Sequence, residues 1–169
     1  LVRSRGLGDV YKRQVVYMRI ATHEAKIDDL EPLYKIELEC FHHEAFPKTW
    51  LAYFLETPKF VSLVASVNGQ IAGFVIGSVE RYKNRLCGHI YSLDVSQKYR
   101  RRGVAYRLLD EVEKIFIRKG AEVSRLEVRA DNVPALRLYE KRGYTATETL
   151  RNYYRNGVNG FRLQKDLSR

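Results

Sequence analysis

The sequence is poor in cysteine and has no long hydrophobic run. Its only cysteines, Cys40 and Cys87, are far apart and lack the spacing of metal ligands. Two isolated cysteines indicate a reducing compartment and buried or inert thiols, with a disulfide between them as the alternative. No apolar stretch approaches the roughly 20 residues that a membrane-spanning helix needs. These absences argue against a disulfide-rich secreted domain and a transmembrane protein, and we expect a cytoplasmic location.

Methionine is scarcer still, because Met18 is the only one in the chain. The preceding stretch, LVRSRGLGDVYKRQVVY, has no initiator methionine, no apolar signal-peptide core and no sustained periodicity. Part of it resembles translated linker sequence. We therefore expect residues 1–17 to be a non-native or disordered leader, and residues 18–169 to form a single domain.

Acidic residues are outnumbered, with 20 Asp and Glu against 30 Lys and Arg, so the net charge is +10. Residues 1–17 contain four basic residues and one acidic residue, so the chain without them carries +7. This imbalance favours an anionic partner, which could be nucleic acid, the ribosome, a membrane surface or a phosphorylated cofactor. The sign of the charge does not choose among them.

Hydrophobic spacing and turn signals predict a mixed α/β domain. Helical spacing or capping signals occur near 28–40, 47–56, 104–119 and 132–143. Strand patterns occur at 19–25, 60–67, 70–79, 88–95 and 123–130, and a final hairpin is expected around Asn156-Gly157. Asn68-Gly69 predicts another hairpin between the second and third strands. The expected order is β-α-α-β-β-β-α-β-α-β-β.

Three consecutive arginines, Arg100 to Arg102, stand between a predicted strand and a predicted helix. A helix begins with unpaired N–H groups and a partial positive charge, which attract an anion. Gly103 and Ala105 let an anion approach the backbone closely, and arginine side chains suit phosphate. A solvated charged patch is the alternative interpretation. A nucleic-acid grip gains nothing from this position, so the strand–loop–helix context favours a pyrophosphate site.

The loop RRRGVA resembles the R/Q-x-x-G-x-G/A motif with which the GNAT acetyltransferase superfamily holds the pyrophosphate of acetyl-CoA. The preceding YSLDVSQKYR is similar to the bulged fourth strand of that superfamily, and NVPALRLYEKRGY resembles its N-x-x-A-x-x-L-Y-x-x-x-G-F/Y segment. The resemblance implies a mostly antiparallel sheet of about seven strands with about four helices, and acetyl-CoA as cosubstrate without a metal. The implied cofactor-binding residues are Leu93, Asp94, Val95, Arg100, Arg101, Arg102, Gly103, Val104, Ala105, Asn132 and Tyr139.

Within the superfamily, LEVRADNVPALRLYEKRGY is most similar to the RimI-type protein N-terminal acetyltransferases. The ending RNYYRNGVNGFRLQKDL resembles a hairpin shared by that group and the archaeal N-terminal acetyltransferases, with Val158-Asn159 in place of an acidic pair. The resemblance implies a protein N-terminus as acceptor, with ribosomal proteins among the candidates, and no specific nucleic acid or membrane partner. It places Phe46, Pro47, His89, Tyr153 and Tyr154 at the acceptor site. The oligomeric state stays open between monomer and homodimer.

The implied reaction is direct attack of an amine on the acetyl thioester. Glu127 matches the general base of the family, and strand alternation places it with Arg125 and Arg129, opposite Leu126 and Val128. Tyr139 matches the general acid; its hydroxyl titrates near 10 in the unperturbed state and can protonate the leaving thiolate. Solvent exposure for Glu127 and core packing for Tyr139 are the alternatives.

Two further features have competing interpretations. His89 lies near a position that holds a water molecule in some relatives, although an ordinary half-buried histidine would look the same. The run FHHEAF suggests a metal site, but adjacent side chains at a helix end point in different directions, so we expect a loop that walls the acceptor site. The alternative functions are acetylation of a polyamine, an antibiotic or lysine by the same fold, and a basic binding module without catalysis.

Overall fold

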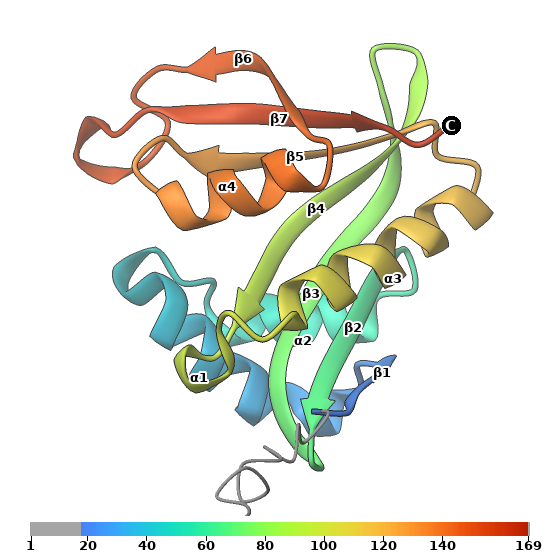
Figure 1. The fold of residues 1–169 in the computed structure, drawn as a ribbon, viewed down its shortest axis with the longest axis vertical. Coiled ribbons are helices and arrows are strands. Elements are labelled where there is room, and N and C mark those ends of the chain that lie inside the picture. Colours follow the sequence, from blue (N-terminus) through green and yellow to red (C-terminus); the bar gives the residue numbers. More distant parts are fainter. Residues whose placement is uncertain (1–17, 169) are drawn as a thin grey trace, which may run out of the picture.

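The computed structural model describes residues 18–168, so the leader predicted for residues 1–17 lies outside the described residues. The chain forms seven strands and four α-helices in the predicted order (Figure 1). The strands are β1 (Ile20–Glu24), β2 (Phe60–Val67), β3 (Gln70–Tyr82), β4 (Arg85–Val95), β5 (Val123–Arg129), β6 (Thr145–Leu150) and β7 (Gly160–Asp166). The helices are α1 (Leu30–Phe41), α2 (Lys48–Glu56), α3 (Val104–Arg118) and α4 (Val133–Lys141). The predicted mixed α/β class is confirmed. None of the helices within residues 18–168 is long and apolar enough to cross a bilayer.

The seven strands form one sheet in the order β1-β2-β3-β4-β5-β7-β6. All neighbours are antiparallel except β4 and β5, which run parallel over Cys87–Ile90 and Val123–Leu126. Beyond Ile90 no described strand pairs with β4 on its β5 side, and the two strands diverge (Figure 1). The sheet is therefore split at its centre, and one edge of β4 is open over Tyr91–Val95.

Two apolar cores hold the helices on opposite faces of the sheet. On one face α3 buries Val104, Leu108, Leu109, Val112 and Phe116 against β2, β3 and β4 (Figure 1). On the other face α1 and α2 pack their apolar sides on β2 and β3 around a separate buried cluster: Ala25, Leu33, Ile36, Leu51, Phe54, Val64, Phe74 and Ile76. Helices α1 and α3 therefore bury apolar residues at the helical spacing that the sequence predicted.

The turns that separate these elements follow from local chemistry. Asn68 and Gly69 both adopt positive φ angles, 51° and 78°, as a two-residue hairpin turn requires. Asn132 caps α4, since its side-chain oxygen accepts a hydrogen bond from the Ala135 N–H at 3.3 Å. The predicted turn and cap are both confirmed.

Two hairpins differ from the prediction: the β3–β4 hairpin is longer, and the β6–β7 connection is a longer loop. Strands β3 and β4 are joined by Lys83 and Asn84, which both have positive φ angles, so β3 runs to Tyr82 and β4 begins at Arg85. The sequence did not predict this extension because the segment is charged and lacks alternation. In the last hairpin, residues 151–159 connect β6 to β7, so Asn156-Gly157 forms only part of a longer loop.

Candidate active site

The open edge of β4 carries an irregularity that alters which residues face each side of the sheet. The register between β3 and β4 shifts, so Ile76 pairs with Ser92 while Gly77 pairs with Ile90, and Tyr91 is the extra residue. A bulge was expected near Leu93 to Val95, and the structure places it two residues earlier. The bulge puts Ser92 and Asp94 on the α1 face, while Leu93 and Val95 pack against the α3 core.

The arginine loop lies between the end of β4 and the start of α3. Arg101 and Gly103 have positive φ angles of 62° and 85°, and no heavy atom lies within 4 Å of a Cβ built on Gly103. The first intrahelical bond of α3 runs from the Arg107 N–H to the Gly103 carbonyl. The N–H groups in the first turn after Gly103 therefore have no acceptor within the helix, and the approach to them is open. An anion fits this geometry.

The three arginines of the loop differ in their surroundings. The Arg100 side chain folds back, and its Nε donates to the Val95 carbonyl at 3.1 Å while its guanidinium reaches Cys40 Sγ at 3.5 Å. Arg101 and Arg102 are exposed.

Cys40 and Cys87 are both free, and burial with the nearby Asp94 charge raises the pKa of Cys40 to about 11. The inert thiols predicted from the sequence are thus consistent with their surroundings.

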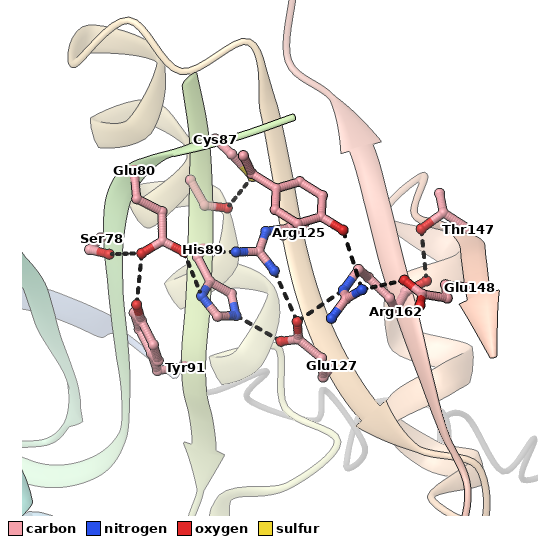
Figure 2. A network of polar contacts seen from close by, with 12 residues as sticks. Ser78, Glu80, Cys87, His89, Tyr91, Arg125, Glu127, Thr147, Glu148 and Arg162 are labelled. Carbon is pink, nitrogen blue, oxygen red and sulfur yellow. Dashed lines mark hydrogen bonds and ion pairs between the residues drawn. The ribbon is translucent and has the colours of Figure 1, made fainter. Parts of the chain in front are cut away.

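Glu127 lies on β5 and accepts hydrogen bonds from three side chains (Figure 2). Arg125 Nη1 donates to its Oε1 at 3.0 Å, and Arg162 Nε donates to the same oxygen at 3.2 Å. His89 Nε2 lies 2.7 Å from its Oε2. Only 12% of the Glu127 side chain is exposed, so it is not the solvent-facing glutamate of the alternative interpretation. Leu126 and Val128 point to the opposite core, as alternation predicted.

His89 connects Glu127 to a second carboxylate on β3. Its Nδ1 lies 3.1 Å from Glu80 Oε1, and Glu80 also accepts hydrogen bonds from Arg125 at 2.7 Å and from the Tyr91 hydroxyl at 2.8 Å (Figure 2). An imidazolium at His89 would donate to both carboxylates. At the other end of the network Arg162 contacts Glu148 on β6. The network therefore links five strands, β3, β4, β5, β7 and β6, across the sheet.

The electrostatics of this network keep its two central carboxylates ionised. Burial, the largest influence, raises the pKa of Glu127, but the His89 hydrogen bond, the Arg162 hydrogen bond and the Arg125 charge outweigh it, so the pKa lies below its usual value. The pKa of Glu80 is likewise lowered, because Tyr91, His89 and Arg125 outweigh the burial that raises it. Glu127 is therefore a carboxylate at neutral pH.

Tyr139 lies on α4, where it is buried and packs edge-on against Tyr144 with ring centroids 5.6 Å apart. Burial raises the pKa of its hydroxyl above the usual value, and the Asp94 carboxyl, when ionised, acts in the same direction. Among the described residues no hydrogen-bond partner of this hydroxyl is found. The ring of Tyr139 is thus packed in the core, as the alternative interpretation expected. Its hydroxyl stays protonated and is not held by any of the described side chains.

Four of the five residues predicted for the acceptor side come from two loops, while His89 lies on β4 in the network of Glu127. Phe46 stacks on Trp50 at 5.9 Å and lies beside Pro47, which caps α2. Tyr153 and Tyr154 lie in the loop between β6 and β7, and their rings contact each other at 5.0 Å. Glu44, from the short 3-10 helix His42–Glu44, joins the loops, because it accepts from Arg129 Nη1 at 2.8 Å and from the Arg155 N–H at 3.2 Å. No cluster of three metal-ligating side chains is found within residues 18–168.

The sequence reasoning missed most members of the network around Glu127. Strand alternation placed Arg125 on the same face as Glu127, but it did not identify Arg125 as a hydrogen-bond partner of the carboxylate. Arg162 lies directly opposite Glu127 in the β5–β7 register, and Glu80 comes from a part of β3 that the sequence did not assign. Neither position follows from sequence spacing alone, because both depend on strand pairing.

Comparison with known proteins agrees with this geometry. Residues 28–144 match the acetyltransferase (GNAT) family. The chain is 29% identical to the N-terminal acetyltransferase A complex catalytic subunit NAA10 of Arabidopsis thaliana over 88% of this chain and 78% of the relative. It is 30% identical to an N-alpha-acetyltransferase of Sulfurisphaera tokodaii over 85% of this chain and 90% of the relative.

Solved structures share the fold. The ribosomal-protein-S18-alanine N-acetyltransferase from Escherichia coli superposes with a TM-score of 0.78 at 24% identity, over 89% of this chain and 96% of that one. Arabidopsis thaliana NAA60, solved in complex with acetyl-CoA, superposes with a TM-score of 0.77 at 22% identity, over 88% of this chain and 98% of that one. The split sheet and the open N-terminus of α3 agree with the family match over residues 28–144. The chain belongs to the acetyltransferase (GNAT) family.

Proposed function

We propose that this protein transfers the acetyl group of acetyl-CoA to the N-terminal α-amino group of a protein. The observation that carries the proposal is a largely buried carboxylate, Glu127, at the centre of the sheet where β4 and β5 diverge. The relatives NAA10 and the Sulfurisphaera tokodaii enzyme are named for this activity. The supported acceptor is therefore an α-amine.

Acetyl-CoA fits the open edge of β4 and the start of α3. The pyrophosphate takes the N–H groups that follow Gly103, with the exposed Arg101 and Arg102 side chains beside them. The pantetheine arm pairs with the backbone of Leu93 to Val95, which has no partner strand on that side among the described residues. Arg100 shapes the end of β4 by its bond to the Val95 carbonyl rather than by reaching outward.

Glu127 acts as the general base, with a water molecule between it and the amine. A carboxylate has about four lone-pair sites. Arg125 and Arg162 occupy Oε1 and His89 occupies one site on Oε2, so one acceptor site remains on Oε2. His89 holds the carboxylate in place and is a positioning residue in this scheme.

Tyr139 acts as the general acid that protonates the leaving thiolate. Its raised pKa keeps the proton on the hydroxyl until the thiolate forms. Asn132 supports this arrangement by capping α4, the helix that carries Tyr139.

The nature of the amine favours a protein N-terminus over lysine. At pH 7 an α-amino group with a pKa near 8 costs about 1.4 kcal/mol to deprotonate, whereas lysine near 10.4 costs about 4.6 kcal/mol. A carboxylate whose pKa is lowered is a weak base, so it suits the amine that loses its proton more easily. A small amine such as a polyamine is the second candidate, and the positive net charge disfavours it.

The direct test is incubation with acetyl-CoA and a peptide library that varies the first two residues, with spermidine and an N-terminally blocked lysine peptide as competitors. We expect mass spectrometry to locate the acetyl group on the α-amine, with kcat/KM highest for a subset of N-terminal sequences. Faster acetylation of spermidine or of the lysine side chain would replace the proposal by the second candidate. Absence of transfer to any amine, with acetyl-CoA bound, would favour the binding-module alternative.

A further inference from the structure

Two carboxyl groups are buried together between α1 and β4, away from the Glu127 network. Glu37 on α1 and Asp94 on β4 are each only 1% exposed. The Ser92 hydroxyl lies between them, 2.6 Å from Asp94 Oδ1 and 3.3 Å from Glu37 Oε2. The second oxygen of Glu37 accepts a hydrogen bond from the Phe46 N–H at 2.8 Å. One buried cluster therefore joins the open strand β4 to the loop that precedes α2.

When both carboxyls are ionised, the cluster lacks one hydrogen-bond donor. A serine hydroxyl carries a single proton and can donate to only one of the two carboxylates. Asp94 Oδ2 is buried and has no hydrogen-bond partner among the described residues. A carboxylate oxygen in that position would lose its hydration without compensation. A proton on Asp94 Oδ1 eases both problems: it donates to the Ser92 oxygen, so that the Ser92 hydroxyl can donate to Glu37, and it leaves Oδ2 as the oxygen of a neutral carboxyl.

The charged and titratable groups around Asp94 favour that proton. Glu37 and Cys40 face it from α1, Arg100 from the loop after β4, and Tyr139 from α4. Burial and then the Glu37 charge raise the pKa of Asp94 well above its usual value, and the Ser92 hydrogen bond and Arg100 only partly oppose them. The opposing residue on β3 is Phe74, which is apolar.

We infer that Asp94 carries a proton at neutral pH and forms with Glu37 a positioning pair, which holds the Phe46 loop against the strand that binds acetyl-CoA. The Phe46 N–H is bound by Glu37, and Glu37 is held to β4 through Asp94 and Ser92. Loss of the Asp94 proton places a negative charge beside the Glu37 carboxyl in a buried site. The loop that carries Phe46 and Pro47 then loses its anchor. The inference rests on the proposed function, since it assigns this loop to the acceptor site.

The first experiment observes the proton itself, without substrates. The side-chain carboxyl carbon of Asp94 is followed by ¹³C NMR against pH in the full chain. We expect the signal of a protonated carboxyl at pH 7, and a titration that the Phe46 amide resonance follows. An Asp94 carboxyl that is ionised at pH 7 would overturn the inferred proton on Asp94, whatever amine the enzyme acetylates.

The second experiment tests the positioning role with two variants of Glu37. Glu37→Gln keeps an oxygen for the Phe46 N–H and gives Asp94 an amide donor, so the KM for the acceptor peptide stays close to that of the wild type. Glu37→Met has similar length but leaves the Phe46 N–H without its acceptor and removes the oxygen that the Ser92 hydroxyl contacts, so this KM rises about tenfold. The KM for acetyl-CoA and the value of kcat change little in either variant.

Glu113→Gln is the matched control, because Glu113 is a buried carboxylate on α3 that bonds Tyr144 and Lys165 away from this loop. It should leave the peptide KM unchanged. Equal peptide KM values for the two Glu37 variants, or an equal rise in the KM for acetyl-CoA, would contradict the positioning role. If Glu37→Met does not fold, the positioning role is tested by the pH dependence of the Phe46 amide resonance. This resonance should change with pH in the wild type and should not change in Glu37→Gln. Any other result would contradict the positioning role.

Discussion

Glu127 lies in surroundings that weaken it as a base. Three donors contact its carboxylate, and together they lower its pKa despite burial. Each unit by which a base's pKa is lowered corresponds to about 1.4 kcal/mol less affinity for the proton. The same donors fix the direction of the carboxylate, so Glu127 is less basic but well oriented. The proposed chemistry therefore depends on an amine that is already easy to deprotonate.

Replacing Glu127 by Gln should lower kcat at pH 7 by a factor of about 10² to 10⁴, the usual contribution of a positioned base. The loss should shrink as the pH rises past the pKa of the α-amine, since free amine needs no base. The measurement is the pH–rate profile on an N-terminal peptide. Glu80→Gln is the matched control, because Glu80 contacts the same His89 and Arg125 and its loss perturbs the network without removing the base. Equal losses in the two variants would assign the effect to the network instead.

Replacing Tyr139 by Phe should lower kcat without rescue at high pH, because the leaving thiolate still lacks its proton donor. The ring packing against Tyr144 is retained in this variant, so the fold should be unaffected. Acetyl-CoA affinity, measured by calorimetry, should remain close to that of the wild type. Recovery of the Tyr139→Phe variant at pH 9 to the same extent as Glu127→Gln would contradict the separate acid and base roles.

At the scale of elements, the arginine loop depends on a left-handed residue at Gly103. Its φ angle of 85° is one that Asn and Asp tolerate better than other residues with side chains. Gly103→Asp and Gly103→Asn therefore impose similar backbone strain and similar bulk, and differ mainly in charge. We expect the Asp variant to bind acetyl-CoA more weakly than the Asn variant, with a difference that shrinks at high salt. Equal affinities in titrations at low salt would argue against a phosphate site at this loop.

The packing of α3 on the sheet depends on two glycines in neighbouring strands. A Cβ built on Gly88 lies 2.0 Å from Cδ2 of Phe116, and one built on Gly77 lies 2.6 Å from the same ring. The ring is fully buried. Because well-packed interiors do not accommodate an added methyl group freely, Gly88→Ala should lower the free energy of unfolding by about 1–3 kcal/mol.

Phe116→Leu provides the test of that packing. In the Gly88→Ala background it should recover part of the lost stability, although it creates a cavity when introduced alone. Urea denaturation of the four proteins gives the coupling between the two sites. Additive effects would show that the strand glycine is required for another reason.

At the scale of the whole molecule, the excess of positive charge is expected to act without sequence recognition. Nothing in the described residues resembles an element that reads bases, and Arg101 and Arg102 are exposed at the loop assigned to pyrophosphate. We expect weak RNA binding that falls steeply with salt and decreases when acetyl-CoA is saturating. Filter binding with unrelated RNA oligomers measures both effects. A tight, sequence-selective complex at physiological salt that acetyl-CoA does not disturb would favour the binding module.

The element order and the position of the arginine loop could be predicted from the sequence because their causes are local. Turn residues such as Asn68-Gly69, the cap at Asn132 and the apolar stripe of α3 act within a few neighbours along the chain. The arginine loop could be placed for the same reason, since it joins two adjacent elements. The sheet of seven strands followed from the family resemblance and is confirmed.

The tertiary structure decided what surrounds each candidate side chain. Glu127 contacts His89 across a parallel strand pair and Arg162 across an antiparallel pair, and both contacts depend on register. The bulge at Tyr91 directs Ser92 and Asp94 toward α1. There Ser92 contacts Glu37, which lies 55 residues before it in the sequence. Burial, pairing and therefore protonation are set by contacts between distant segments. The sequence by itself determined which groups are available, and the packing of the sheet determined which of them meet.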